Sequence, residues 1–275
     1  MCRLLATAAA EPRTVADVLG PERPRVFQDM ARVHDDGWGH AWLTPGKAVR
    51  VQRSAESGFD HSGLAGALTA NASPAHLVHL RFATTGLACT IENTHPFIAD
   101  GMAFAHNGSI APLAELDDRL PMFIRPSLRG DTDSERYFAL IRAHRRAGAG
   151  LDTAVMSAVR TIRAFAPAAS LNALLLTPTT LVAIHASQHA SVPIAALEAS
   201  ANGFRLPEAH DERYYRMHIF RHLDGSVAIA SSGMDVTGWD ELPTESVSFI
   251  SLQSLEIQTL SIDTVSSPRA TAPMV

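Results

Sequence analysis

Cysteine is scarce in this sequence, which has only Cys2 and Cys89 among its 275 residues. Two thiols are too few for a scaffold stapled by disulfides, and a lone bridge would be unusual in a cytosolic chain. A zinc site is not indicated either, because the closest histidine pair, His76 and His79, would point to opposite faces of the strand that HLVHLRFA predicts. Each cysteine therefore needs an explanation of its own.

Long apolar runs and a strong charge of either sign are also missing. No stretch approaches the roughly 20 apolar residues of a membrane helix, and the opening MCRLLATAAAEPR is too short and gains charge too early for a signal peptide. With 46% hydrophobic residues, 19% charged residues and a formal net charge of -5, the composition is typical of a globular protein with a mildly acidic surface. We therefore expect a cytoplasmic protein with neither nucleic acid nor a membrane as partner.

What is present is a series of short strand patterns on both sides of a pair of helices. Strand character in CRLLATA, HDDGWGHAWL, HLVHLRFA and GMAFAHNG returns later in LNALLLT, TLVAIHA, YYRMHIF and SVAIASS. Between them, apolar spacing predicts one helix after an N-cap at Thr132 or Asp133, and a second over about Thr153 to Phe165. This order favours an α+β fold with antiparallel sheets over a doubly wound parallel sheet.

The pattern indicates a single domain over residues 1–275. No repeat, low-complexity block or linker divides the sequence, and a second catalytic module would need on the order of 100 further residues. Only the tail at about 265–275, within SSPRATAPMV, is poor enough in apolar residues to be predicted flexible.

Cys2 directly follows the initiator methionine. Removal of Met1 would leave Cys2 with both a thiol and a free α-amino group, whose reference pKa of about 7.7–8.0 suits it to accept the thiol proton directly or through a water. The plain alternative is that Met-Cys is an accident at the start of a buried strand. The dipeptide alone does not decide between these two interpretations.

The wider set of motifs favours the first interpretation. Taken together and in order, MCRLLAT, HDDGWGHAWL, HLRFATTG, ENTHPF followed by AHNGSI, and GDTDSE resemble the glutaminase domain of class II glutamine amidotransferases. The resemblance runs from Cys2 to about Glu135, and YYRMHIF and SVAIASSG look like the closing half of the small, stand-alone members. It implies the N-terminal-nucleophile fold, a four-layer αββα sandwich of two antiparallel sheets.

The resemblance also assigns substrate-binding roles. It gives Arg81 the α-carboxylate of glutamine, which a planar, permanently charged fork can grip with two hydrogen bonds. Asp133 would pair with the α-ammonium, while Thr84, Thr85 and His95 would line the pocket without a more definite task. The simpler alternatives are a strand-end salt bridge for Arg81 and helix capping for Asp133.

Asn107 and Gly108 are the implied oxyanion hole. A side-chain amide and a glycine N–H at the end of an apolar strand could both donate to one developing negative oxygen. Out of context, Asn-Gly is more often a hairpin turn. Cys89 matches no catalytic position of the family and is predicted to be a free thiol in a loop.

The implied reaction is amide hydrolysis. Cys2 would attack the γ-carboxamide of glutamine or a γ-glutamyl compound and give glutamate and ammonia or an amine through a thioester, with no metal and no organic cofactor. The nitrogen could pass to a separate ammonia-accepting subunit or simply be released. An alternative of another class is a catalytically inactive protein that binds glutamine or a γ-glutamyl compound, which the joint presence of the residues above disfavours.

Overall fold

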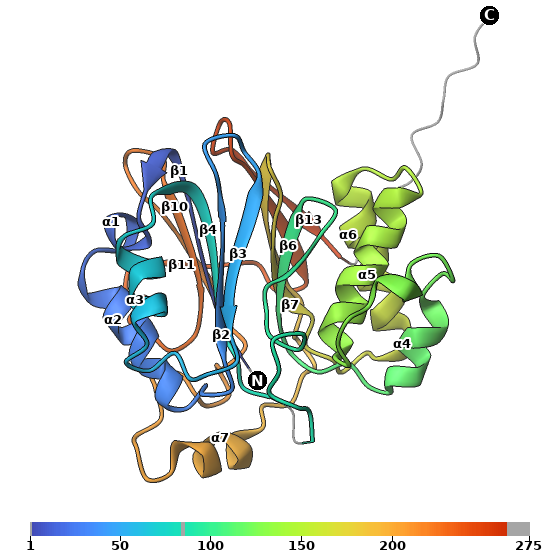
Figure 1. Cartoon of the computed structure of the whole chain (residues 1–275), viewed down its shortest axis with the longest axis horizontal. Helices are drawn as coiled ribbons and strands as arrows, with labels where there is room; N and C mark the ends of the chain where they lie inside the picture. Colours follow the sequence, from blue (N-terminus) through green and yellow to red (C-terminus); the bar gives the residue numbers. More distant parts are fainter. Residues whose placement is uncertain (1, 84–85, 263–275) are drawn as a thin grey trace, which may run out of the picture.

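The computed structural model describes residues 2–83 and 86–262, and in it two sheets pack face to face with helices on both outer sides (Figure 1). The expectations for Met1, for Thr84 and Thr85, and for the tail at about 265–275 fall outside the described residues. Every strand pairing within the described parts of the two sheets is antiparallel. The predicted α+β class and the four-layer αββα sandwich are confirmed.

The first sheet has seven strands in the order β11-β9-β10-β1-β4-β2-β3. In chain order these strands are β1 (Arg3–Arg13), β2 (Trp38–Leu43), β3 (Val49–Ser54), β4 (Ser73–Leu80), β9 (Met217–Arg221), β10 (Val227–Ser231) and β11 (Asp240–Glu241). β1 lies in the middle, with Leu5 opposite Ala230 on one side and Val78 on the other. Cys2 immediately precedes this central strand. It therefore lies at the end of a strand that is paired on both sides, which fixes its position.

The second sheet has six strands in the order β13-β12-β8-β7-β6-β5. They are β5 (Phe97–Ala99), β6 (Met102–Asn107), β7 (Asn172–Leu176), β8 (Thr180–His185), β12 (Ser246–Ser251) and β13 (Ile257–Ser261). β6 ends at Asn107, which lies opposite Asn172 at the start of β7. The other candidate catalytic residues therefore belong to the second sheet.

Helices cover the outer face of each sheet (Figure 1). Those on the first sheet are α1 (Val15–Leu19), α2 (Glu22–Asp29) and α3 (Ser62–Thr69), and those on the second are α4 (Leu113–Arg119), α5 (Asp133–Arg146) and α6 (Leu151–Phe165). Two short 3-10 helices are η1 (Met30–Arg32) and η2 (Arg125–Ser127). α7 (Ile194–Ala201) lies outside these layers, at the end of the sandwich where the N-terminus also lies (Figure 1).

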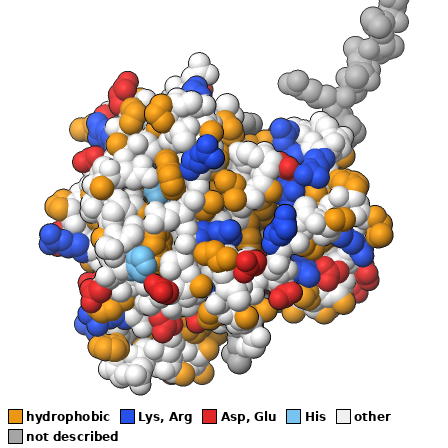
Figure 2. Space-filling view, viewed as in Figure 1, with side chains coloured by type: hydrophobic (Ala, Val, Ile, Leu, Met, Phe, Trp, Pro, Cys, Tyr) orange, Lys and Arg blue, Asp and Glu red, His pale blue; other side chains and the backbone are white. Residues whose placement is uncertain are grey.

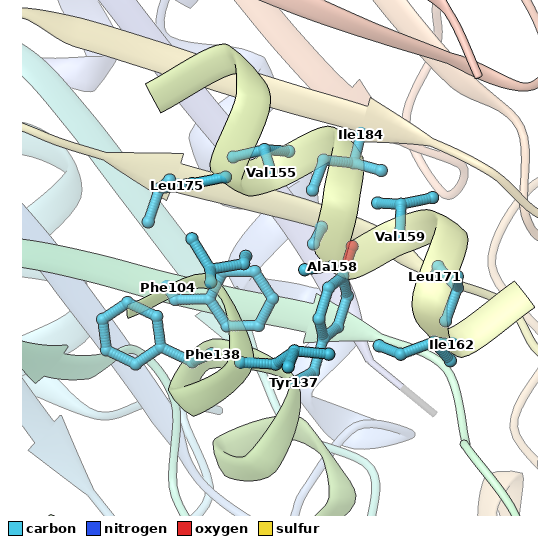
Figure 3. Close-up of a cluster of buried hydrophobic side chains, with 14 of the residues drawn as sticks. Phe104, Tyr137, Phe138, Val155, Ala158, Val159, Ile162, Leu171, Leu175 and Ile184 are labelled. Carbon is cyan, nitrogen blue, oxygen red and sulfur yellow. The ribbon is translucent and has the colours of Figure 1, made fainter. Parts of the chain in front are cut away.

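Alternating side chains divide the core into layers. Along β4, Leu77 packs between the two sheets, whereas Val78 and Leu80 pack under α1, α2 and α3. On the other side of the molecule, Phe104 of β6 packs against Tyr137 and Phe138 of α5 (Figure 3). Burial of both sheet faces holds the strand ends, and hence the candidate site, in fixed positions.

The local predictions hold with small changes at element ends. Thr132 is the N-cap of α5, since its side chain accepts a hydrogen bond from the backbone N–H of Glu135. α6 begins at Leu151, slightly before the predicted Thr153. The strand predicted from YYRMHIF begins only at Met217, which leaves the two tyrosines in the loop before it.

The surface carries both signs of charge. On the face in Figure 2, Lys and Arg side chains are interspersed with Asp and Glu. Within residues 2–83 and 86–262, no helix has the length and apolar character to cross a lipid bilayer.

Candidate active site

The two sheets bring Cys2 and Asn107 into direct contact. The backbone N–H of Cys2 donates to Oδ1 of Asn107 at 2.9 Å, although the residues are 105 positions apart in sequence. Asn107 is fully buried, and its Nδ2 has no hydrogen-bond partner among the described residues. A buried amide N–H without a partner is costly, and here it belongs to the side chain that already binds the residue carrying the thiol.

The thiol of Cys2 lies against the loop that follows β4. Its Sγ is 3.8 Å from the carbonyl oxygen of Phe82, and the residue is only 6% exposed. Because Arg81 immediately precedes Phe82, the same short segment carries a guanidinium group and the carbonyl group that contacts the thiol.

Gly108 is required by a close approach rather than by a turn. A Cβ at this position would collide with the carbonyl oxygen of Ser170 and would come within 2.7 Å of Nε2 of His106. Ser170 also donates from Oγ to the carbonyl oxygen of Asn107 at 2.8 Å. Because β6 pairs with β5 and β7 and leads on to α4, Asn-Gly does not form a tight hairpin here, and that alternative is wrong.

Arg81 is buried, and its guanidinium contacts carbonyl oxygens. Nη1 donates to Asp36 and Nη2 to Ala88, both at 3.3 Å. Within the described part of the chain it forms no ion pair, so the strand-end salt bridge considered from sequence is not observed. A buried cation bound to neutral acceptors retains the capacity to bind an anion.

Asp36, which the sequence analysis did not single out, holds the loop around Arg81. Its carboxylate accepts from the backbone N–H of Ala83 at 2.6 Å and from the thiol of Cys89 at 3.2 Å. Partial burial raises the pKa of the Cys89 thiol, and the neighbouring Asp36 raises it further by a smaller amount. Cys89 is a free thiol in an exposed loop, as predicted, and it is held in its protonated form.

Asp133 is the first residue of α5 and lies beside the segment that follows Asn107. Its carboxylate accepts hydrogen bonds from the backbone N–H groups of Ile110 and Ser134. Oδ1 also accepts from Oγ of Ser134 at 3.3 Å, whereas Oδ2 accepts from Ile110 and has a further lone pair that can bind an ammonium group. Thr132 is the N-cap residue, and Asp133 adds to it by accepting from the first-turn N–H of Ser134, so a structural role at the helix start and a role in binding are compatible.

His95 lies in the interior of the molecule. Its ring is 4.3 Å from that of His79 and 4.6 Å from that of Phe97, measured between centroids. Burial lowers its pKa well below the usual value, so the imidazole is neutral. His76 instead contacts His40, which confirms that His76 and His79 face opposite sides of β4. Contact of His95 with a substrate stays a prediction.

A buried arginine next to Cys2 was missed from sequence. Arg3 donates from Nε to the carbonyl oxygen of Cys2 at 2.6 Å and from Nη1 to the carbonyl oxygen of Ser232 at 2.8 Å. Its guanidinium carbon lies 3.7 Å from the ring centroid of Tyr214, whose hydroxyl donates to the same Cys2 carbonyl at 3.3 Å. The sequence signal was a lone charge at the head of the apolar run RLLATA.

We expect Arg3→Met to lower the free energy of unfolding by about 2–4 kcal/mol, because it leaves the buried carbonyls of Cys2 and Ser232 with fewer donors. Urea denaturation would measure the change. The control is Arg50→Met, at an exposed position of β3, which should stay within about 0.5 kcal/mol of the parent. Equal stability of the two variants would contradict a structural role for the Arg3 contacts.

A cavity of about 360 Å³ adjoins this group of residues. Phe82 and Ala83 line it after β4, Ser109 after β6, and Ser170 before β7. Further lining comes from the segment that leads into α7 and from Tyr215 before β9. Within the described ranges, no group of three or more His, Cys, Asp or Glu side chains is arranged to hold a metal ion.

Comparison with known proteins agrees with these features. The family model for class II glutamine amidotransferases matches residues 1–195. The glutamine–fructose-6-phosphate aminotransferase (isomerizing) of Rhizobium meliloti strain 1021 is 28% identical over 151 residues, which cover 52% of this chain and 23% of that protein. The enzyme of the same name from Zymomonas mobilis is 32% identical over 142 residues, again 23% of its length. The chain thus spans about a quarter of these relatives.

Solved structures share the fold. A glutamine aminotransferase class II domain protein from Silicibacter pomeroyi has a TM-score of 0.60 at 18% identity, with 94% of this chain and 99% of that one covered. The phosphoribosylpyrophosphate amidotransferase of Bacillus subtilis has a TM-score of 0.63 at 14% identity, covering 96% of this chain and 50% of that one. A predicted glutamine amidotransferase from Pseudomonas aeruginosa has a TM-score of 0.52 at 20% identity, with 93% and 99% covered.

Proposed function

Because this chain belongs to the class II glutamine amidotransferases, we propose that it hydrolyses the γ-carboxamide of glutamine or of a γ-glutamyl compound, with Cys2 as an N-terminal nucleophile. The observation that carries the proposal is the hydrogen bond from Cys2 N to Oδ1 of Asn107. This bond holds the nitrogen of Cys2, which becomes the α-amine when Met1 is removed, against the side chain of Asn107. The Nδ2 group of that side chain has no partner among the described residues.

The reaction requires that Met1 be removed, so that the nitrogen of Cys2 becomes an amine. This amine takes the thiol proton, and Sγ attacks the carboxamide carbon to form a tetrahedral oxyanion. Nδ2 of Asn107 and the N–H of Gly108 donate to that oxyanion. The C–N bond then breaks as the α-ammonium gives its proton to the leaving nitrogen.

Water completes the cycle. The neutral α-amine takes a proton from the water that attacks the γ-glutamyl thioester, and collapse of the second tetrahedral intermediate breaks the C–S bond. Glutamate leaves and the thiol is restored. We propose that ammonia or the amine is released as product or passes to a separate ammonia-accepting subunit.

Arg81 and Asp133 are proposed to hold the two charges of the amino-acid head group. The buried guanidinium, which donates to the carbonyl oxygens of Asp36 and Ala88, would bind the α-carboxylate, and the carboxylate of Asp133 would bind the α-ammonium. His95 and the pair Thr84 and Thr85 remain candidates for the walls of the substrate site.

The proposal is tested by glutamate release from glutamine and from a mixture of γ-glutamyl amides, using purified protein whose intact mass shows that Met1 is absent. Turnover without an added acceptor supports hydrolysis. If protein that starts at Cys2 binds these compounds but turns over none of them, the catalytically inactive binding protein becomes the better interpretation.

We expect Arg81→Lys to lower kcat/KM for glutamine by about 30- to 150-fold, because a point charge cannot reproduce the two parallel hydrogen bonds of a planar fork. Glutamine with its α-carboxylate amidated should lose about 2–5 kcal/mol of transition-state binding with the parent enzyme. Both would be measured by initial rates.

The control for this substitution is Arg146→Lys, in an exposed ion pair with Asp100, which should leave kcat/KM unchanged. Equal use of glutamine and its α-amide would show that Arg81 does not bind the α-carboxylate.

A further inference from the structure

The reaction proposed above gives no role to the cavity beside Cys2. Its volume of about 360 Å³ lies within the range of small-molecule sites, about 300–1,000 Å³. Its outer wall is the segment around α7, from which Ala190, Ser191, Pro193 and Ala196 line it. The buried side of α7, at Leu197, holds the helix in place in a cluster with Tyr214 and Tyr215.

The cavity meets the reacting position from two sides. Phe82, one of its lining residues, has its carbonyl oxygen 3.8 Å from Sγ of Cys2. Ser170, another lining residue, donates to the carbonyl oxygen of Asn107. A group attached to the carboxamide at Cys2 can therefore extend directly into this space.

The head-group residues lie elsewhere. Arg81 and Asp133 are not among the described residues that line the cavity. The guanidinium of Arg81 is directed to the carbonyls of Asp36 and Ala88, and the carboxylate of Asp133 to Ile110 and Ser134. Neither head-group side chain lines the cavity, so its space is left for another part of the substrate.

The lining is apolar with a few hydroxyl groups. The side chains of Phe82, Ala190, Pro193 and Ala196 are hydrocarbon. The hydroxyl of Tyr215 is uncharged, and burial raises its pKa further above the ordinary value. Transfer of a charged group into such surroundings is unfavourable, whereas an alkyl or aromatic group gains from burial.

We propose that this cavity is an amine subsite, which holds the uncharged, apolar substituent on the nitrogen of a γ-glutamyl amide. The substituent has the size of a branched alkyl group or a single aromatic ring. The inference rests on the proposed function and names its substrate class: the bond from the γ-carbonyl carbon to nitrogen breaks, nitrogen takes a proton from the Cys2 α-ammonium, and the amine departs from the cavity.

Three substrates test the subsite with the full-length protein: glutamine, γ-glutamyl-isobutylamide and γ-glutamylglycine. The two amides are similar in size, but glycine carries a carboxylate. We expect kcat/KM for the isobutylamide to exceed that for γ-glutamylglycine by about tenfold or more, as an apolar pocket discriminates.

A pair of variants on α7 locates the effect. Ala196→Phe projects a ring from a lining residue, whereas Ala195→Phe makes the same change at the neighbouring exposed position that does not line the cavity. Ala196→Phe should lower the ratio of kcat/KM for the isobutylamide to that for glutamine by about tenfold. Ala195→Phe should leave this ratio at the parent value.

The outcomes separate the two levels of the proposal. If glutamine is hydrolysed but the isobutylamide is used no better than γ-glutamylglycine, or if both variants change the ratio equally, the amine subsite is wrong and the proposed function stands. If neither glutamine nor either amide is hydrolysed, both are wrong.

Discussion

Replacement of Cys2 by alanine is expected to reduce glutamate release by a factor on the order of 10⁴–10⁶, which is the effect of removing a nucleophile that acts as a unit with its base. Cys2 is nearly buried at the head of β1, and alanine is smaller and apolar, so the fold should be retained. Initial rates with glutamine would measure the loss, and circular dichroism and thermal melting would verify the fold.

Cys89→Ala is the matched control, because Cys89 is the other cysteine of the sequence and is exposed. Its removal should leave kcat unchanged. A glutamine-like electrophile such as diazo-oxo-norleucine should label Cys2 and not Cys89. Equal loss in the two variants, or label on Cys89, would place the nucleophile elsewhere.

The α-amine can be tested without changing a side chain. Protein with a cleavable N-terminal extension should be inactive and should gain full activity when cleavage leaves Cys2 as the first residue, with intact mass following the conversion. Activity before cleavage would show that another group accepts the thiol proton.

The second large effect is expected at Asn107. Asn107→Asp keeps an acceptor for the Cys2 nitrogen but removes the Nδ2 donor, and Asn107→Ala removes both. Both variants should lower kcat by about 10²–10³, the usual effect of losing one oxyanion donor. KM should change far less, because the donor is needed most in the transition state.

Asn172 is the control for this substitution. It is the buried asparagine opposite Asn107, and both ends of its amide are bonded within the fold, to the backbone of Ala186 and Tyr215. Asn172→Asp should lower the free energy of unfolding by about 1–3 kcal/mol while kcat per folded molecule stays near the parent value. If Asn172→Asp lowers kcat per folded molecule more than Asn107→Asp does, Asn107 is not the oxyanion donor.

Much of the fold could be predicted because its signals are local. Short apolar stretches mark β1, β4 and β6, and the spacing around Tyr137 and Phe138 marks α5. Cys2, Arg81 and Asn107 lie at or next to strand ends, and Asp133 begins α5. Element ends were less accurate, as at the starts of α6 and β9, because the first turn of a helix and the first pair of a strand depend on neighbours far away in sequence.

The sequence by itself determined the family resemblance, the sandwich of two antiparallel sheets, and the identities of Cys2, Arg81, Asn107, Gly108 and Asp133 as candidates. Only the tertiary structure decided that Asn107 binds Cys2 with its oxygen and keeps its amide N–H spare. The same holds for the contacts of Arg3 with Tyr214 and Ser232, which are more than 200 positions away in the chain. The physical reason is that such contacts arise from strand order and loop path. The alanine and serine residues that line the cavity carry no pattern of their own until the fold brings them to the thiol.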